Sequence, residues 1–597
     1  RIQSHAMFAS HLPCSLVLLI VAKSHEVFYF DLEKAIAHEK LSYEEQALAF
    51  AFQGLVNNAS DAWPTLFFNT GSLDFDWPKA DIQWRQYLED AGRVTFRNLS
   101  STLCDLVIQA DPLKRVKGTV VYDSRGPDPL QVGDGYSLAI ALTISGQQSI
   151  LPVHAAALNR HACLHDLPLK IDLRSIPQLD HRSSAWDWAI ETLLPQASKS
   201  VVFNLNRYRL PADPVDILHD PQSNATITTI DYAVQQRAFV LDSETHLPPG
   251  RGGGDDDALV QRVFANLSPL FSAYGWSYEY SWTNITSHAG GAVFCSFATP
   301  SLSFWATLPV DADGGKTSRP LPHNDRGMHL DKSKRYVVFQ TNEGDTPRIV
   351  ASLFGSAWAS PHRGSLPVAW AINPLLAEQF PALFDYYAKT ATVNDSFIAG
   401  VGGAGYVFLN QMSEQHFNAY AHRAGRVLEK YGPNVVDTYG FASFELMKNY
   451  SRNAAAAGTA AAAYVSQPTN WPFTGLSSLS CPRPNNWQED GTPVICTPDS
   501  DPWLFYYADG LNKSCPSCDF AARIKQHAER YEPPVVINTY GGLHWTAGTQ
   551  EPLKEFWTLL HDTMARLGDD YMAIGAQEMA RLTREMGGGA LIAPVVI

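Results

Sequence analysis

The feature that most constrains the fold is the regular alternation of apolar runs and amphipathic stretches after Arg335. Runs of strand length separated by segments of helical periodicity are typical of repeated β/α units around a parallel sheet. We expect strands at residues 336–340, 367–372, 397–400, 435–439, 462–466, 503–507, 535–539 and 572–575. We expect helices between most of them, for example at 375–387, 414–431, 519–531 and 551–567. Seven or eight such units predict a (β/α)7-8 TIM-like barrel.

The remainder of the chain predicts smaller α/β modules in front of this barrel. The chain has 597 residues, which exceeds one domain of ~100–200 residues. Strand-like runs at 27–32, 116–122 and 201–205 alternate with helical stretches. We therefore predict an α/β fold with modules at 24–112, 113–226 and 227–330, and a barrel at 331–597 that carries a cysteine-containing insertion at about 472–518.

The charge balance excludes some classes of partner. The net charge is −15 and no run is rich in Lys or Arg, so nucleic acid and anionic membranes are not expected partners. No stretch of 18 or more apolar residues is present, so no transmembrane segment is predicted. The apolar run at 14–22 has the length of a signal-peptide core or of a buried strand, and the sequence leaves both open for residues 1–23. The oligomeric state is also left open.

Sequons and cysteines favour a secreted or cell-surface glycoprotein. One N-x-S/T pattern means little, but eight along one chain are typical of a protein of the secretory pathway. The candidate glycosylation sites are Asn58, Asn98, Asn224, Asn266, Asn284, Asn394, Asn449 and Asn512. Four of the eight cysteines crowd into one stretch, at Cys481, Cys496, Cys515 and Cys518. Only the last pair has zinc-ligand spacing, so disulfides are the better interpretation.

Polar residues follow the ends of the expected strands, where a β/α barrel carries its active site. Glu343 and Asp345 follow the first strand, and Asp437 and Tyr439 end the fourth. Further polar or aromatic residues at such positions are Asn470, Trp471, Asp509, Asn538, Tyr540, Gln577 and Glu578. A pair of carboxyl groups on one rim is what glycosidic bond hydrolysis requires. Either Glu343 or Asp345 could instead cap the next helix, and Asp437 could bind a backbone amide.

Several segments resemble the GxGYxYP family of inferred glycoside hydrolases. In Asn394-Asp-Ser-Phe-Ile-Ala-Gly-Val-Gly-Gly-Ala-Gly-Tyr-Val-Phe-Leu409, the residues Gly403, Gly405 and Tyr406 match the signature that names the family, whereas Phe408 and Leu409 depart from it. Asn342-Glu-Gly-Asp345 resembles an acidic strand-end element of the family. Phe28-Tyr-Phe-Asp-Leu32 with Gln53-Gly-Leu-Val-Asn57, and Trp276 with Glu279, extend the resemblance toward the N-terminus.

The resemblance implies several α/β modules in front of a barrel-like domain, and hydrolysis of a glycosidic bond in an extracellular polysaccharide or glycoconjugate. Asp345 and Glu343, and next Asp437, are then the expected acid, base or nucleophile. The expected substrate contacts are Gly403, Gly405, Tyr406, Tyr439, Asn470, Trp471, Asp509, Tyr540, Glu279 and Trp276.

Two alternatives stay open. The first is a non-catalytic glycan-binding or extracellular structural protein on the same scaffold, since fold does not fix function. The second is a metal-dependent hydrolase such as a deacetylase, which needs clustered ligands. His323, His329 and His544 form no compact set in the sequence, so no metal and no cofactor are expected.

Overall fold

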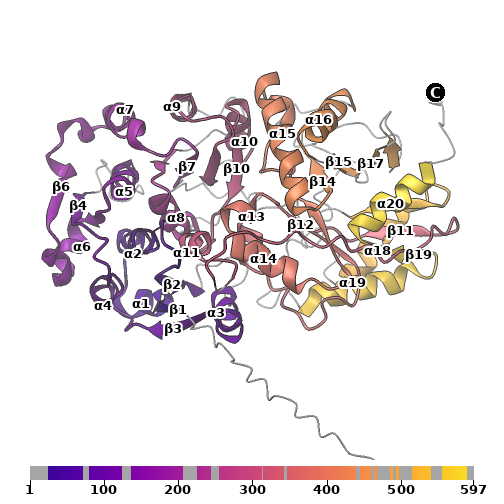
Figure 1. The fold of residues 1–597 in the computed structure, drawn as a ribbon, viewed down its shortest axis with the longest axis horizontal. Helices are drawn as coiled ribbons and strands as arrows, with labels where there is room; N and C mark the ends of the chain where they lie inside the picture. The colour runs from indigo at the N-terminus through magenta and orange to yellow at the C-terminus, as the bar shows by residue number, and fades with distance from the viewer. Residues whose placement is uncertain are drawn as a thin grey trace, which may run out of the picture.

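The computed structural model describes most of the chain outside its two ends. The residues it describes are 25–58, 60–71, 79–123, 136–205, 225–243, 254–277, 279–311, 313–341, 346–438, 444–458, 461, 463–466, 485–487, 492–496, 514–539 and 554–587. Figure 1 shows two halves, with the N-terminal sheets on the left and the C-terminal strands on the right. Helices α11 (Leu302–Thr307), α13 (Leu376–Gln379) and α14 (Pro381–Thr390) lie between them.

The N-terminal half holds three parallel sheets. The first has the order β2-β1-β3 and the strands β1 His25–Asp31, β2 Leu66–Asn69 and β3 Val94–Asn98. The second has the order β5-β4-β6 and the strands β4 Thr119–Tyr122, β5 Leu151–His154 and β6 Leu169–Asp172. The third has the order β10-β9-β7-β8 and the strands β7 Val201–Asn204, β8 Phe239–Leu241, β9 Ser272–Gly275 and β10 Ala292–Cys295. Strand β7 falls within the predicted second module, yet it pairs with β8 and β9 of the third.

Helices connect and cover these strands. They are α1 Leu32–Glu39, α2 Tyr43–Val56, α3 Ala80–Asp90, α4 Leu103–Gln109, α5 Tyr136–Gln148, α6 Ala155–Arg160, α7 Arg182–Thr192, α8 Ile230–Gln235, α9 Gly254–Phe264 and α10 Glu279–His288. Helix α2 begins at a capping box, in which Ser42 and Glu45 exchange hydrogen bonds between side chain and backbone. Because α2 and α5 are apolar on nearly every side, they lie inside the half rather than on its surface.

Two disulfides are present among the described residues. Cys104 of α4 is bonded to Cys163 in the second sheet's region, which ties the first two predicted modules together. Cys515 is bonded to Cys518 at the start of α18 (Pro516–Ala528), so the disulfide interpretation of that pair agrees with the structure. Cys481 lies outside the described residues.

The C-terminal half contains parallel strands close to those expected. They are β11 Arg335–Val338, β12 Val368–Ile372, β13 Asp395–Ala399, β14 Val435–Thr438, β15 Ala463–Ser466, β17 Pro493–Cys496, β18 Val535–Asn538 and β19 Tyr571–Ala573. Strand β16 (Asn485–Trp487) pairs antiparallel with β17, and both lie inside the predicted insertion. The strand expected at 503–507 lies outside the described residues.

These strands form two sheets joined at one bridge. The orders are β12-β13-β14-β15-β17-β16 and β18-β11-β19, and Gln340, just past β11, forms a parallel bridge with Ala369 of β12. The parallel α/β prediction is confirmed. The closed barrel is not, because the described strands include no pairing between β17 and β18.

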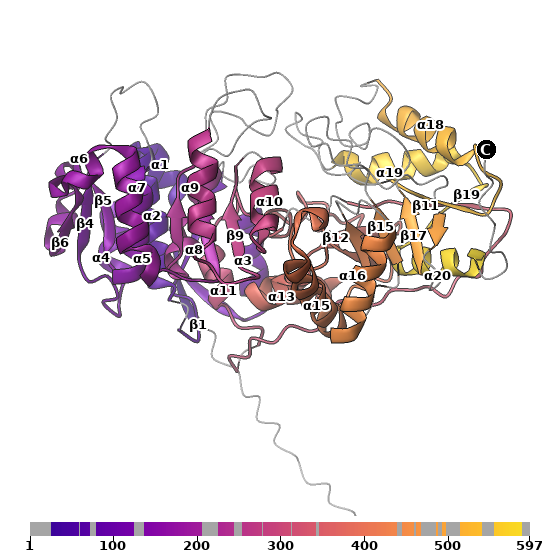
Figure 2. The ribbon, with the colours of Figure 1, turned by 90° about the horizontal axis from the view of Figure 1, so that it is seen from above.

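Helices flank the sheets on both sides. They are α12 Arg348–Ala351, α15 Glu414–Tyr431, α16 Phe444–Ala457, α18, α19 Lys554–Leu567 and α20 Ala576–Gly587. In Figure 2, α18 and α19 lie on one side of the strands and α20 on the other. The last helix contributes Met579 and Leu582 to an apolar cluster that also holds two inward residues from β11 and one from each of six other strands. The members from strands are Tyr336, Val338, Ala369, Ile398, Val435, Ala463, Ile495 and Val536.

Candidate functional site

Three polar side chains come together just beyond this apolar cluster. Side chains alternate between the two faces of a strand, so the residue two positions past an inward one also points inward. Gln340, Asp437 and Asn538 stand two positions past Val338, Val435 and Val536, on or just after β11, β14 and β18. All three are fully buried. The C-terminal ends of these strands therefore carry a polar layer over an apolar one.

The three side chains form a hydrogen-bonded chain across the interior. The Asn538 amide nitrogen donates to Gln340 Oε1 at 2.7 Å, and Gln340 Nε2 donates to Asp437 Oδ2 at 2.7 Å. The oxygen of the same Asn538 amide, Oδ1, is buried without a hydrogen-bond partner among the described residues. Because an unpartnered buried polar atom is costly, this oxygen is a candidate contact for a ligand hydroxyl.

The backbone of Asp437 is held by the glycine-rich segment that follows β13. The Gly402 N–H donates to the Asp437 carbonyl at 2.8 Å, and the Gly400 N–H donates to Ile372 of β12. Gly402 has a φ of 78°, which side chains other than glycine rarely adopt. A Cβ there would also overlap the Tyr420 hydroxyl.

The predicted sugar contacts Gly403, Gly405 and Tyr406 lie in this segment; Gly405 and Tyr406 pack against β10 of the third sheet, whereas Gly403 lies beside Tyr450 of α16. Tyr406 and Val293 exchange two backbone hydrogen bonds, of 2.9 and 3.0 Å. A Cβ on Gly405 would stand 2.6 Å from that of Ala292. Tyr406 is only 5% exposed and packs edge-on against Phe408, with ring centroids 5.9 Å apart. This placement favours a role in joining the two halves over direct contact with a sugar.

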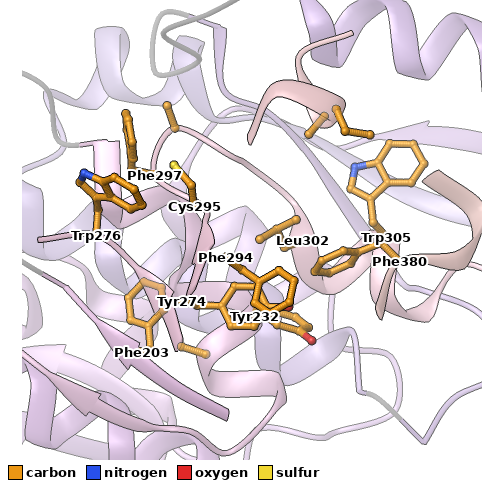
Figure 3. Packing of buried hydrophobic residues seen from close by; sticks show 14 of the residues in the cluster. Phe203, Tyr232, Tyr274, Trp276, Phe294, Cys295, Phe297, Leu302, Trp305 and Phe380 are labelled. Atoms are coloured by element: carbon orange, nitrogen blue, oxygen red, sulfur yellow. The ribbon is translucent and has the colours of Figure 1, made fainter. Parts of the chain in front are cut away.

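Trp276 from the third sheet is also buried. It follows β9, is 6% exposed, and packs against Phe297 with ring centroids 5.8 Å apart. Figure 3 shows this pair beside Cys295, the last residue of β10. The guanidinium of Arg348 also lies over the Phe297 ring, with its carbon 3.9 Å from the ring centroid. Arg348 is fully buried. Its contact with Phe297 joins the region of the third sheet to the chain just after the predicted acidic segment.

Most other predicted site residues lie outside the described residues. These are Glu343, Asp345, Tyr439, Asn470, Trp471, Asp509 and Tyr540. Glu279 is the first residue of α10, but its side chain is not among those described. Of the three predicted catalytic carboxylates, the structure therefore places Asp437.

The prediction that Gln577 and Glu578 join the same rim is wrong. Helix α20 begins beside the first residues of β13, where the Ala576 N–H donates to Ser396 Oγ and Gln577 Nε2 donates to the Phe397 carbonyl. Glu578 binds Arg326 through both carboxylate oxygens, at 2.7 and 2.6 Å. Its carboxylate therefore stabilises the fold, through the ion pair with Arg326, at the opposite end of the strands.

The sequence analysis did not single out Gln340, Arg348 or Phe297. Gln340 had a readable signal, because it continues the inward series Tyr336, Val338 along one strand. Arg348 and Phe297 come from segments 51 positions apart, and nothing in the local pattern joins them.

The described residues include no group of three or more His, Cys, Asp or Glu side chains that could hold a metal ion. Among the same residues, no helix combines the length and apolar character needed to cross a membrane.

Comparison with known proteins finds a family model that matches part of the C-terminal half. Residues 333–473 match the model of the GxGYxYP putative glycoside hydrolase C-terminal domain, which confirms the family resemblance. The match covers β11 to β15, the glycine-rich segment and Asp437. No curated protein matches the chain.

A solved structure has a similar fold over nearly the whole chain. It is the crystal structure of a putative hydrolase from Bacteroides thetaiotaomicron VPI-5482, with a TM-score of 0.70 and 14% sequence identity. The match covers 94% of this chain and 95% of that one. At this identity the likeness concerns the fold alone.

Proposed function

We propose that this chain is a glycoside hydrolase whose C-terminal strands form a TIM-like barrel around the buried Asn538–Gln340–Asp437 chain. The observation that carries the proposal is the carboxylate of Asp437, held at the carboxyl ends of parallel strands by an amide hydrogen bond. In β/α barrels this end of the strands is where catalytic groups gather. The family match over residues 333–473 supports a carbohydrate substrate.

A second carboxylate can reach Asp437 from the segment after β11. Glu343 and Asp345 stand three and five positions past Gln340. An extended chain spans at most ~3.5 Å per residue, so three and five residues correspond to a reach of at most roughly 11 and 18 Å. Gln340 itself contacts Asp437. A carboxyl separation of ~5–10 Å, which glycosidases use, is therefore within reach of either acid.

The hydrogen bond from Gln340 suits Asp437 to accept a proton or attack carbon. Gln340 Nε2 donates to Asp437 Oδ2, so this carboxylate oxygen acts as a hydrogen-bond acceptor at the ends of the strands. We therefore assign Asp437 the role of base or nucleophile. Glu343 or Asp345 is then the general acid that protonates the leaving oxygen.

The direct test is product release from a panel of polysaccharides and aryl glycosides. We expect the wild-type protein to generate new reducing ends or free phenol from at least one substrate, and Asp437→Asn to lose this activity. Binding of a glycan without release would favour a non-catalytic glycan-binding protein instead. Release that is equal in wild type and variant would contradict the assignment of Asp437.

We also propose that the chain is a secreted glycoprotein. The exposure and hydrogen bonds of each sequon asparagine indicate which of them can carry a glycan. Asn98 at the end of β3 and Asn266 after α9 are exposed. Asn394 is different, because it is half-buried and its amide nitrogen donates to the carbonyl of the distant Gly364 at 2.6 Å, whereas that of Asn266 donates only to Arg262, four positions earlier, at 2.9 Å. A glycan is attached through that nitrogen, so modification of Asn394 would displace a backbone contact.

When the protein is secreted from a eukaryotic host, we expect glycans on Asn98 and Asn266 and none on Asn394. Mass spectrometry of peptides before and after enzymatic removal of N-glycans measures occupancy at each site. The double variant Asn98→Gln, Asn266→Gln is the control and should lose two glycans from the intact mass. A glycan on Asn394, or bare Asn98 in secreted material, would contradict this assignment.

A further inference from the structure

The glycine-rich segment 400–409, which carries the family signature, is buried rather than open to a ligand. Tyr406, Phe408 and Leu409 are each 5% exposed or less. The segment was expected to contact sugar, yet its side chains face protein. Its role in the molecule must therefore come from what it holds in place.

Two buried tyrosine hydroxyls hold the backbone of this segment. Tyr420 of α15 accepts a hydrogen bond from the Ala404 N–H at 3.1 Å and donates one to the Gly405 carbonyl at 2.7 Å. Tyr450 of α16 donates to the Gly402 carbonyl at 2.6 Å. Burial raises the pKa of both hydroxyls above the ordinary value of 10, so both remain protonated donors. The two helices thus hold the backbone at Gly402, Ala404 and Gly405, in a stretch with no side chain longer than a methyl group.

The held backbone connects directly to the candidate catalytic residue and to the N-terminal half. Gly402 donates its N–H to the carbonyl of Asp437 while its own carbonyl accepts from Tyr450. Four positions later, Tyr406 pairs with Val293 of β10, and the Phe408 N–H donates to Ser287 Oγ of α10 at 2.9 Å. One short segment therefore links β14, two helices of the C-terminal half and the third sheet.

We propose that segment 400–409 is a joint that sets the position of Asp437, with Tyr420 and Tyr450 as positioning residues. The expected effect on catalysis rests on the proposed function. The expected effect on the backbone of the segment and of β14 does not. The proposal accounts for the glycines, because a Cβ at Gly402 or Gly405 would collide with Tyr420 or Ala292. It also accounts for Phe408 in place of the family's second tyrosine, because the contact to Ser287 uses only backbone.

The test removes single hydroxyls and keeps the rings. Tyr420→Phe loses two hydrogen bonds to the segment, and Tyr450→Phe loses one, so the second variant remains informative if the first folds poorly. Tyr136→Phe is the matched control, because Tyr136 is a buried tyrosine of α5 whose hydroxyl donates to the Leu179 carbonyl at 3.0 Å, far from the site. Hydrogen exchange followed by mass spectrometry then compares the peptides that cover 400–409 and β14.

We expect exchange in both peptides to accelerate by about tenfold or more in Tyr420→Phe, and less in Tyr450→Phe. On a substrate that the wild type cleaves, kcat should fall by about 10- to 100-fold with KM within about twofold, because a small displacement of a reacting group costs this much. Unchanged exchange in β14, or a fall in kcat no larger than that of Tyr136→Phe, would overturn the joint. A wild-type protein that cleaves no glycoside would instead overturn the proposed function, and the exchange result would still decide the joint.

Discussion

Replacing Asp437 by Asn is expected to lower kcat by about 10³-fold or more while leaving the fold intact. The asparagine keeps the shape of the side chain and can still accept the hydrogen bond from Gln340 Nε2 through its amide oxygen. What it loses is the negative charge and the ability to take a proton or attack carbon. Because the residue is fully buried, no bulk water replaces that function at the same position.

Steady-state kinetics and thermal unfolding of the same samples measure the effect of this substitution. The matched control is Asp385→Asn, which alters another buried carboxylate of the C-terminal half, bound to Arg319 at 2.7 Å and away from the polar chain. We expect the control to keep its kcat. A kcat for Asp437→Asn above about one tenth of wild type would remove Asp437 from the chemistry and leave the acids after β11 as the remaining candidates.

Local sequence signals predicted the C-terminal elements closely. The helix expected at 414–431 is α15, Glu414–Tyr431. Its ends are readable because Ser413 caps its first turn and Gly432 follows its last residue. Strands expected at 367–372 and 435–439 are β12 and β14, each within one or two residues. Apolar runs between helical stretches fix such strands without knowledge of their partners.

Pairing between distant strands was beyond the reach of these signals. Strand β7 belongs with β9, about 70 positions later, although the strand before it in the sequence, β6, belongs to another sheet. The hairpin of β16 and β17 extends the main sheet from inside a segment that composition assigns to an insertion. Periodicity specifies which face of a strand is apolar, and many partners satisfy that requirement.

The site was predictable to the extent that it follows strand geometry. Asp437 and Asn538 stand at strand ends and are joined there through hydrogen bonds to Gln340. Glu578 also follows a strand, yet the Ala576 N–H bonds Ser396 and directs α20 to the opposite end of β13. The packing of the glycine-rich segment could not be predicted for a similar reason, because its partner Val293 comes from another sheet. In both cases a contact distant in sequence decides which way the chain turns.

A buried carboxyl in the N-terminal half, that of Asp231, predicts that the stability of the protein depends on pH. Asp231 of α8 is fully buried, and its Oδ2 accepts the Ser303 N–H at 2.7 Å while Oδ1 has no hydrogen-bond partner among the described residues. Burial raises the pKa of Asp231 to about 7 from an ordinary value of 3.8. The neutral acid is therefore the form that the folded protein prefers.

The direction of this pKa shift determines how the stability of the fold changes with pH. Below about pH 4 the carboxyl is protonated in both the folded and the unfolded chain, and its contribution to stability is fully present. As the pH rises toward 7, the unfolded chain releases the proton while the folded protein retains it, so the folded state loses stability. Asp81, with a pKa raised by burial to about 6, acts in the same direction.

We expect Asp231→Asn to reduce the loss of folding stability that the wild type shows as the pH rises. Relative to wild type, the free energy of unfolding of the variant should rise by roughly 2–4 kcal/mol between pH 4 and pH 8, since one pKa unit corresponds to about 1.4 kcal/mol. Urea unfolding midpoints at each pH measure the difference, and Asp562→Asn, which alters an exposed carboxylate of α19, should run parallel to wild type. If the wild-type and Asp231→Asn curves stayed parallel, Asp231 would have to be ionised in the fold. A cation or a further hydrogen-bond donor would then have to face Oδ1, because a buried charge with an unpartnered oxygen is costly.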